Sequence, residues 1–348
     1  MKTGEALSKA EGSSSFQVTH YSVIAIAWPM TLAFLSTPIL GLVDTGVVGR
    51  LGSPAMLGGL AIGAVLFDII FTTFNFLRAS TTALVAQALG ANDMRAQSVV
   101  LVRSLILSVL GGALVLLFSG VVLNIGLWGM DVQGSVADAT TLYFSVRIYS
   151  APPTLINYSI LGWMLGLGRA RLGLLLQTVL NGTNIVLSIY LGLHLNWGIE
   201  GVAWATVFSE LFAALLGLLI AWNVTLKNRG WSWASLVHYE ELRRLLMVNR
   251  DIMIRSFALL FAFAFFTAQG AKFGELTLAA NAVLMNFFLI AGYFLDGFAT
   301  AAEQLVGRSI GARYRPAFDR TVRLAMFWGF VLAGLTTLFV LTAGPWVI

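Results

Sequence analysis

Long apolar segments, separated by short polar breaks, follow one another along almost the whole chain. A membrane-spanning helix needs about 20 predominantly apolar residues. Nine windows of the sequence have that character: 22–49, 56–79, 100–124, 139–162, 171–193, 200–222, 252–271, 276–301 and 319–343. Of the 348 residues, 58% are hydrophobic and only 11% are charged, which excludes a soluble globular domain. The sequence therefore predicts an all-α, polytopic membrane bundle with about nine spans.

The basic residues predict which end of the bundle faces the cytoplasm. If the N-terminus is cytoplasmic, the Lys and Arg residues of the loops fall inside, apart from Arg50 and Lys272. Cytoplasmic loops carry such an excess of basic residues. The formal net charge of +5 is then explained by membrane topology, so we expect no nucleic-acid partner. The chain has no cysteine, which excludes disulfides and thiolate metal sites.

Polar stretches divide the chain into four parts. Residues 1–20 are polar and contain no signal-peptide pattern, so we expect a cytoplasmic tail. Residues 21–222 hold six spans and predict an N-terminal six-helix bundle. Residues 223–250 resemble an amphipathic cytoplasmic connector. Residues 251–348 hold the last three spans.

An internal repeat relates the two halves. The segment ALVAQALGANDMRA, residues 83–96, aligns without a gap with QLVGRSIGARYRPA, residues 304–317, at an offset of 221. Six spans separate the copies, so both begin on the same side of the membrane, as expected for a parallel repeat with a pseudo-twofold axis along the membrane normal. Two equal halves would need twelve spans. We therefore expect the second half to be incomplete and the chain to insert correctly yet transport poorly, unless it dimerises or the remaining helices come from elsewhere.

Asp44 and Pro29 are the most informative residues of the first apolar window. A charged Asp near the centre of a membrane helix costs roughly 2.5–3.5 kcal/mol, and it is tolerated where it faces a protein interior or a water-filled cavity. Burial disfavours the charged form of a carboxyl group, so Asp44 can take up a proton on one side and release it on the other. Pro29 leaves a backbone carbonyl unpaired, which allows a straight and a bent helix. The alternative is that Asp44 caps or pairs near the outer end and Pro29 is a passive kink.

Two further polar stripes lie at helical spacing. Asp68, Thr72 and Asn75 share one face of the second window, and Tyr293, Asp296, Thr300 and Glu303 share one face of the eighth. They predict a shared acidic cavity for cationic substrates, or else interhelical hydrogen bonds that hold the bundle together. We expect Arg78, Arg147 and Arg255, near span ends, to reach the interface or to pair.

No enzyme signature is present in the sequence. It contains no phosphate-binding Walker loop, no His-Glu-x-x-His zinc motif and no nucleophile elbow. We expect neither catalysis, nor a metal site, nor a cofactor.

Three segments together resemble the multidrug and toxic compound extrusion (MATE) family: LVDTGVVGRLG at 42–52, GIEGVAWAT at 198–206 and ALVAQALGAND at 83–93. The resemblance covers the whole chain and is greatest for the branch named after DNA-damage-inducible protein F. It implies two six-helix bundles facing each other across a central cavity, alternating access, and export of amphipathic compounds driven by H⁺ or Na⁺. It also implies a bacterial inner-membrane protein, which we expect to be monomeric, with small amphipathic substrates and membrane lipids as its partners.

The resemblance also carries over site residues. Asp44 matches the first-helix carboxylate of this branch, and Pro29 matches the proline where that helix bends. Asn184 is kept, but Ser188 stands where the family often has an Asp. Thr206 and Tyr143 match further polar lining positions. With one acid in this cluster, H⁺ is favoured as coupling ion over Na⁺, which needs a cage of hard oxygen ligands.

Two other functions remain open. A flippase for lipid-linked precursors, or a polysaccharide exporter, would have a similar helical architecture, but it would need cations in its cavity to hold pyrophosphate. The candidate lining of this chain is acidic. A partner protein without transport activity is the third possibility.

Overall fold

The computed structural model describes residues 16–227, 250–259, 261–263, 265–266, 269 and 275–347. Every secondary-structure element within these residues is helical. The tail at 1–20 and the connector at 223–250 lie largely outside the described residues, and so does part of the seventh window. The helices are α2 (His20–Gly49), α3 (Pro54–Thr73), α4 (Phe76–Gly90), α5 (Met94–Leu117), α6 (Ser119–Gly129), α7 (Gly134–Arg147), η2 (Ile148–Ser150), α8 (Ala151–Gly166), α9 (Ala170–Ile189), η3 (Tyr190–His194), α10 (Gly198–Ala221), η4 (Trp222–Leu226), α13 (Glu275–Gly311) and α14 (Arg315–Val347).

Short polar residues begin several of these helices. Thr19 forms a capping box with Ser22 at the start of α2. The Ser53 hydroxyl accepts a hydrogen bond from the Met56 amide in α3 at 3.4 Å, and the Asp93 carboxylate accepts one from the Ala96 amide in α5 at 2.9 Å. Each cap pairs an amide that the first helical turn leaves free, so these residues fix where the spans begin.

Two of the expected spans are broken. The second consists of α3 and α4, with the break at Phe74 and Asn75. The fourth consists of α7 and α8, joined by the 3₁₀ turn η2. The second break has a local cause, because Pro152 and Pro153 lack the amide hydrogens that would continue α7, and they are tolerated in the first turn of α8.

Six helical stretches within the described residues are long and apolar enough to cross a membrane: His20–Gly49, Pro54–Gly90, Met94–Leu117, Ala170–His194, Gly198–Leu226 and Arg315–Thr342. The α7–η2–α8 stretch and α13 are not among them, so the count of nine spans stays a prediction. The helical membrane bundle itself is confirmed. Large apolar side chains on α14, such as Phe330 and Leu341, are 74% and 70% exposed, as expected of a surface that lipid covers.

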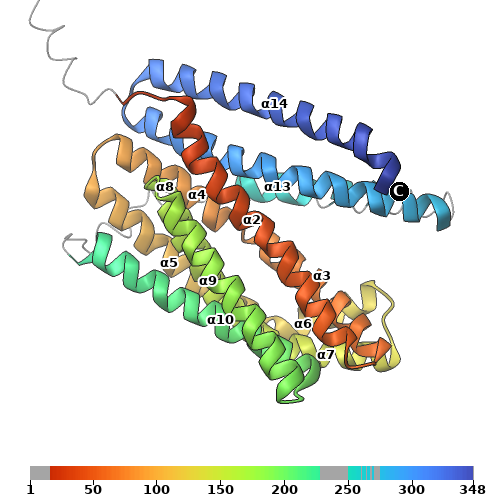
Figure 1. Cartoon of the computed structure of the whole chain (residues 1–348). Helices are drawn as coiled ribbons and strands as arrows, with labels where there is room; N and C mark the ends of the chain where they lie inside the picture. Colours follow the sequence, from red (N-terminus) through yellow and green to blue (C-terminus); the bar gives the residue numbers. More distant parts are fainter. Residues whose placement is uncertain are drawn as a thin grey trace, which may run out of the picture.

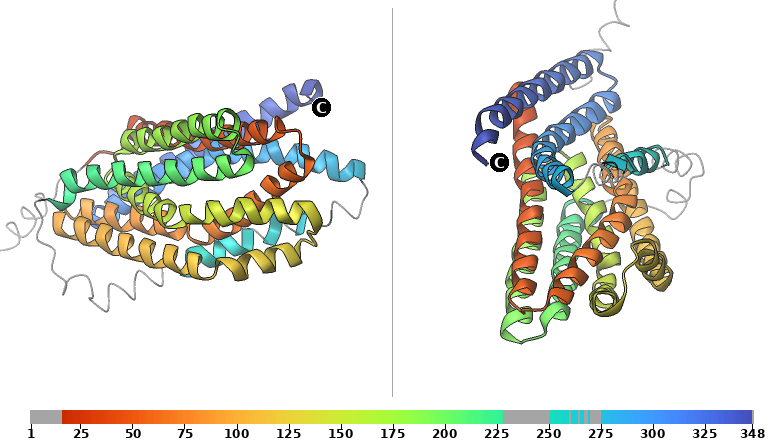
Figure 2. Two further views of the ribbon diagram at one scale, coloured as in Figure 1. Left: turned by 90° about the horizontal axis from the view of Figure 1, so that it is seen from below. Right: turned by 90° about the vertical axis from the view of Figure 1, so that its right-hand side faces the viewer.

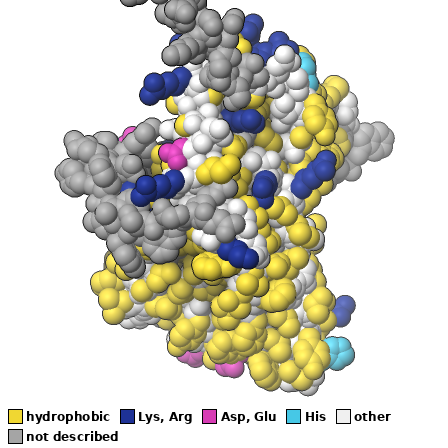
Figure 3. Space-filling model, turned by 90° about the vertical axis from the view of Figure 1, so that its left-hand side faces the viewer, with side chains coloured by type: hydrophobic (Ala, Val, Ile, Leu, Met, Phe, Trp, Pro, Cys, Tyr) yellow, Lys and Arg dark blue, Asp and Glu magenta, His cyan; other side chains and the backbone are white. Residues whose placement is uncertain are grey.

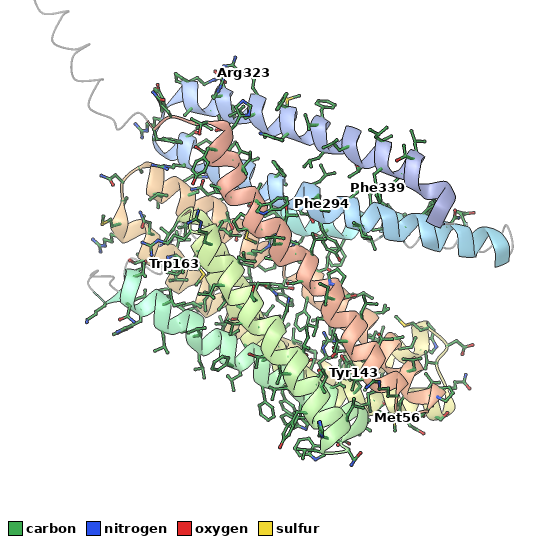
Figure 4. All side chains as sticks on the ribbon, viewed as in Figure 1. Met56, Tyr143, Trp163, Phe294, Arg323 and Phe339 are labelled. Atoms are coloured by element: carbon green, nitrogen blue, oxygen red, sulfur yellow. The ribbon has the colours of Figure 1, made fainter. Side chains whose placement is uncertain are left out.

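The helices form two groups (Figure 1). α2, α9 and α10 lie alongside one another, and α9 and α10 together with α8 enclose a core around Trp163. α13 and α14 lie side by side and cross over the N-terminal helices (Figures 1 and 2). Basic side chains gather in the upper half of the face shown in Figure 3, while its lower half is almost continuously hydrophobic. This distribution agrees with the predicted orientation, which remains a prediction.

The internal repeat of the sequence is also a local structural repeat. Asn92 follows α4 with a φ of 57°, and Arg313, 221 residues later, follows α13 with a φ of 52°. The Asn92 amide donates to the Leu89 carbonyl at 3.1 Å, and the Arg313 amide donates to the Ile310 carbonyl at 3.0 Å. Both copies therefore end in the same left-handed turn.

These two copies meet at one close helix crossing. A Cβ atom added to Gly90 would overlap the carbonyl oxygen of Arg308, and one added to Gly311 would overlap the carbonyl oxygen of Gln87. Gly90 and Gly311 are equivalent in the repeat, and so are Gln87 and Arg308. Such reciprocal contacts are what a twofold axis through the crossing would produce. The crossing closes the gap between α4 and α13 at the end of the bundle that carries the loops at 91–93 and 312–314.

Replacing Gly311 by leucine should separate α4 from α13. Extra side-chain volume at a packed contact costs about 1–3 kcal/mol, which shifts a two-state equilibrium about 5- to 150-fold away from the closed crossing. The chain has no cysteine, so spin labels on cysteines introduced at Met94 and Arg315 would report a longer distance. Gly292→Leu is the control, because no atom lies within 4 Å of its added Cβ. An unchanged distance in the Gly311 variant would contradict the proposed closure.

Candidate functional site

A pocket opens between α2, α3 and α7, toward the end of the bundle opposite the glycine crossing. Its volume is about 410 Å³. One residue of α13, Tyr293, also reaches it. The lining residues that carry charge or a phenol are Asp44, Asp68, Tyr143, Arg147 and Tyr293. Charged and phenolic side chains therefore form part of the pocket lining. The pocket lies where the N-terminal helices face the second half of the chain.

A chain of hydrogen bonds leads from this pocket into the bundle. The Ser188 hydroxyl lies 2.8 Å from Asp44 Oδ1 and 3.0 Å from Asn184 Oδ1, and can donate to either. The Asn184 amide donates to the Thr206 hydroxyl at 3.1 Å. Asn184 and Ser188 are fully buried, whereas Asp44 is half-buried. Four of the predicted site residues are thus joined in one network, with the carboxylate at its pocket end.

Close helix packing positions this network. Asn184 and Ser188 are one turn apart on α9 and so share a face. A Cβ atom on Gly201 of α10 would lie 2.7 Å from the carbonyl carbon of Leu191, and one on Gly192 would lie 2.8 Å from a methyl group of Val47 on α2. Because both positions lack a side chain, α2, α9 and α10 approach closely enough for these short polar groups to meet.

Arg147 is the cation of the pocket. Its Nη1 donates to the Tyr143 hydroxyl at 2.6 Å, and its guanidinium lies 4.6 Å from the centre of the Phe67 ring. Its Nε is buried without a hydrogen-bond partner among the described residues. The prediction that Arg147 lies near a span end was wrong. The helical stretch runs from Gly134 to Gly166, beyond the apolar window, so position 147 falls in its middle.

Asp68 and Asn75 were predicted to share one face of the second span, but the structure separates their surroundings. Asp68 lines the pocket with Asp44. Asn75 stands at the break between α3 and α4, where its side-chain oxygen accepts a hydrogen bond from Arg78 Nε at 3.3 Å. Asn75 is not among the residues that line the pocket of Asp68.

Asp296 and Glu303 lie in a second pocket, of about 560 Å³. Two arginines share it, Arg78 of α4 and Arg255, together with Asp251. The predicted acidic cavity is therefore two pockets, each containing an arginine. Arg78 and Arg255 line this interior pocket, and for Arg78 the long α3–α4 stretch again explains why it is not at a span end.

Pro29 and Pro38 both lie inside α2. Pro29 is fifteen residues before Asp44, which is about 22 Å along a helix, and it is not among the residues that line either pocket. Pro38 does line the pocket of Asp44. The sequence analysis singled out only Pro29, so Pro38 was missed as a lining residue.

Glu210 is a second residue that the sequence analysis missed. It lies in the middle of α10, and the side chain of Asn157 on α8 donates to its Oε2 at 2.6 Å. An acid near the centre of the apolar window 200–222 was the available signal, because ionisable residues inside membrane spans are rare and usually functional.

Comparison with known proteins identifies the family. The family model described as MatE matches residues 29–190 and 252–348. The chain is 39% identical over 325 residues to DNA damage-inducible protein F of Escherichia coli K12, covering 93% of the chain and 71% of that protein. It is 28% identical to Protein DETOXIFICATION 44, chloroplastic, of Arabidopsis thaliana, covering 61% of that protein. It is 23% identical to a probable multidrug resistance protein NorM of Chromobacterium violaceum, covering 68% of it.

Solved structures share the fold. An outward-facing MATE transporter of the MOP superfamily superposes with a TM-score of 0.84 at 20% identity, covering 94% of this chain and 74% of that one. A MOP superfamily transporter from Pyrococcus furiosus, described by a binding pocket of reverse polarity, gives a TM-score of 0.85 at 21% identity, with 94% of this chain and 73% of that one covered.

The fold, the family model and the relatives agree with one another. Because these relatives are transporters and not enzymes, the absence of a catalytic signature has its explanation. The chain belongs to the MATE family of transporters.

Proposed function

We propose that this protein is a proton-coupled antiporter of the bacterial inner membrane that exports amphipathic, often cationic, compounds by alternating access. The observation that carries the proposal is the Asp44 network: a half-buried carboxylate at a pocket, held by the Ser188 hydroxyl. Such a group can bind a proton from the pocket and lose its charge. The relatives named for multidrug resistance and detoxification support the substrate class.

The proposed cycle uses two ends of the molecule. The crossing of Gly90 and Gly311 closes one end, while the Asp44 pocket lies in the other half. If the loops at 91–93 and 312–314 are cytoplasmic, as Arg313 and the flanking Arg95 and Arg315 suggest, this arrangement faces outward. Protonation of Asp44 would then favour rearrangement of α2, for which Pro29 and Pro38 supply weak points in the backbone hydrogen bonding. Solved MATE structures in a straight and in a bent conformation agree with two states.

A flippase or exporter of anionic lipid-linked compounds is the alternative, and Arg147 favours it. A guanidinium in the pocket could bind phosphate oxygens. However, Asp44 and Asp68 line the same pocket, so anions would meet more negative than positive charge there. We therefore place the cation exporter first.

Asp44→Asn should abolish coupled export and leave folding intact, because an Asn side chain still accepts a hydrogen bond from Ser188 but cannot take up a proton at neutral pH. The measurement is uphill efflux of a cationic dye in cells that lack their main exporters, with protein level checked by immunoblot. Asp138→Asn, at an exposed position of α7, is the matched control and should export normally. Full dye efflux by the Asp44 variant would refute its coupling role.

Export should not depend on Na⁺, because the Asp44 cluster holds one carboxylate where a sodium cage needs more hard oxygen ligands. In proteoliposomes with a fixed pH gradient, replacement of Na⁺ by K⁺ should leave the rate unchanged. Ser188→Asp adds the second acid and should make transport sensitive to Na⁺. Transport by the unaltered protein that stops without Na⁺ would overturn the proton assignment.

Arg147→Gln should change which substrates bind. Removing the positive charge should tighten binding of cationic dyes by about 3- to 10-fold, or about 0.7–1.4 kcal/mol, because the two acids then act without an opposing charge. Binding can be measured by dye fluorescence on purified protein, with Arg50→Gln, at the exposed end of α2, as control. If cation binding is unaffected and binding of a pyrophosphate-bearing lipid is lost, the flippase alternative is supported instead.

A further inference from the structure

Glu210 occupies a polar cluster apart from both pockets. It lies in the middle of α10, and its side chain is directed at α8. Asn157 Nδ2 of α8 donates to Glu210 Oε2 at 2.6 Å and to the backbone carbonyl oxygen of Glu210 at 2.9 Å. Asn157 and Thr154 are buried, with 6% and 5% exposure. Glu210 itself is half-buried, and its carboxyl group is held at the contact between α10 and α8.

The position of Glu210 connects it with the Asp44 network. Thr206, the last residue of that network, precedes Glu210 by four residues on α10, so the two side chains lie on the same face one turn apart. Thr206 is nearer the end of α10 where Asp44 lies, and Glu210 is one turn farther toward the glycine crossing. Polar groups thus extend from the pocket through Ser188, Asn184 and Thr206 toward Glu210.

The polar cluster can provide a hydrogen-bond partner for a protonated Glu210. A protonated carboxyl group needs one hydrogen-bond acceptor for its hydroxyl. Asn157 Oδ1 is a buried oxygen with no hydrogen-bond partner within the described part of the chain, and the Thr154 hydroxyl lies beside the Glu210 carboxylate. They stand one turn apart on the face of α8 that meets Glu210. The neutral form of Glu210 could therefore be paired as well as the charged form.

The charged and titratable groups around Glu210 come from several helices. Tyr158 of α8 and Arg147 at the end of α7 act on it electrostatically. α2 contributes Asp44 at the far end of the network, and the part of α9 beside α10 contributes neutral Asn181, Asn184 and Ser188. Tyr149 of η2 stacks with Trp204, and Tyr190 and His194 of η3 lie at the other end of α10. Arg78 also acts on Tyr158, and Arg147 is the cation that acts on Glu210 itself. Among the described residues, Glu210 forms no ion pair at salt-bridge distance.

A purely structural role would not need an acid. A glutamine at position 210 would accept the same hydrogen bond from Asn157 without the cost of desolvating a charge, which is several kcal/mol for a buried ion. The carboxyl group therefore indicates a function that uses its proton.

We propose that Glu210 is a second proton-binding site of the N-terminal bundle, linked to Asp44 by the polar side chains of α9 and α10. The step is reversible addition of H⁺ from water to the Glu210 carboxylate, and its release to water on the other side, with no other bond made or broken. The proposal deepens the proposed proton coupling, on which it rests, by giving the bundle two acids at different depths.

The test is infrared difference spectroscopy of the purified protein during pH titration, which reads the C=O band of protonated carboxyl groups and needs no transport. Glu210→Gln should remove one titrating band from the spectrum of the unaltered protein, and a distinct band should be lost in Asp44→Asn. Glu200→Gln, at the start of α10, is the control and should leave the band that is lost in Glu210→Gln unchanged. Glu210→Ala also loses the hydrogen bond from Asn157 Nδ2 to the side chain of residue 210, so its melting temperature gives the structural contribution of that side chain.

A spectrum of Glu210→Gln that keeps every titrating carboxyl band would overturn the proposal. In proteoliposomes, Glu210→Gln should also lower the number of protons exchanged per substrate while export continues, and an unchanged proton count would equally contradict it. If export itself proves independent of protons, the proposed function fails, but the infrared titration still decides whether Glu210 binds H⁺.

Discussion

The hydrogen bond from Ser188 to Asp44 is the contact on which the site depends. A carboxylate inside a membrane bundle has little water to solvate it, so its charged form must be held by protein donors or be neutralised. The Ser188 hydroxyl, at 2.8 Å, pairs with one lone pair of the Asp44 carboxylate. The other lone pairs of the carboxylate depend on groups in the pocket. This is a weakly held charge, and a weakly held charge can be exchanged for a neutral carboxyl group at low cost.

Glycines make both the site and the closed end possible. Gly192 and Gly201 let α2, α9 and α10 approach until Asp44, Ser188 and Thr206 belong to one network, and Gly90 and Gly311 let α4 and α13 cross with backbone in contact. Lipid does not drive helices together as water does, so close packing of small residues supplies much of their association. The same residue type therefore determines where the bundle holds together and where its polar groups meet.

The sequence predicted most of the fold and part of the site. Apolar windows located the helices, and the 221-residue offset anticipated the matching turns at Asn92 and Arg313. The Asp44, Ser188, Asn184 and Thr206 network came from the family resemblance, since no spacing rule brings together residues on three separate helices. Arg147 was placed near a span end because the apolar window begins only at residue 139. Its helix begins earlier, at Gly134, so Arg147 lies near the middle of the helical stretch. The role of Asn75 in lining a cavity stays a prediction. The helical stripe on which it rests assumed an unbroken helix, whereas the structure has a two-residue break after Thr73.

The two ends of the molecule can influence each other only if their energies are comparable. A pKa difference of one unit between two states is worth about 1.4 kcal/mol, and moving a population from 1:99 to 99:1 takes about 5.5 kcal/mol. A single acid such as Asp44 would need a difference of about four units to do this alone. Two acids in one bundle would need about two units each. If protons open the crossing of Gly90 and Gly311, as the proposed function requires, its stabilisation must be limited to a few kcal/mol, because protons could not open a tighter contact.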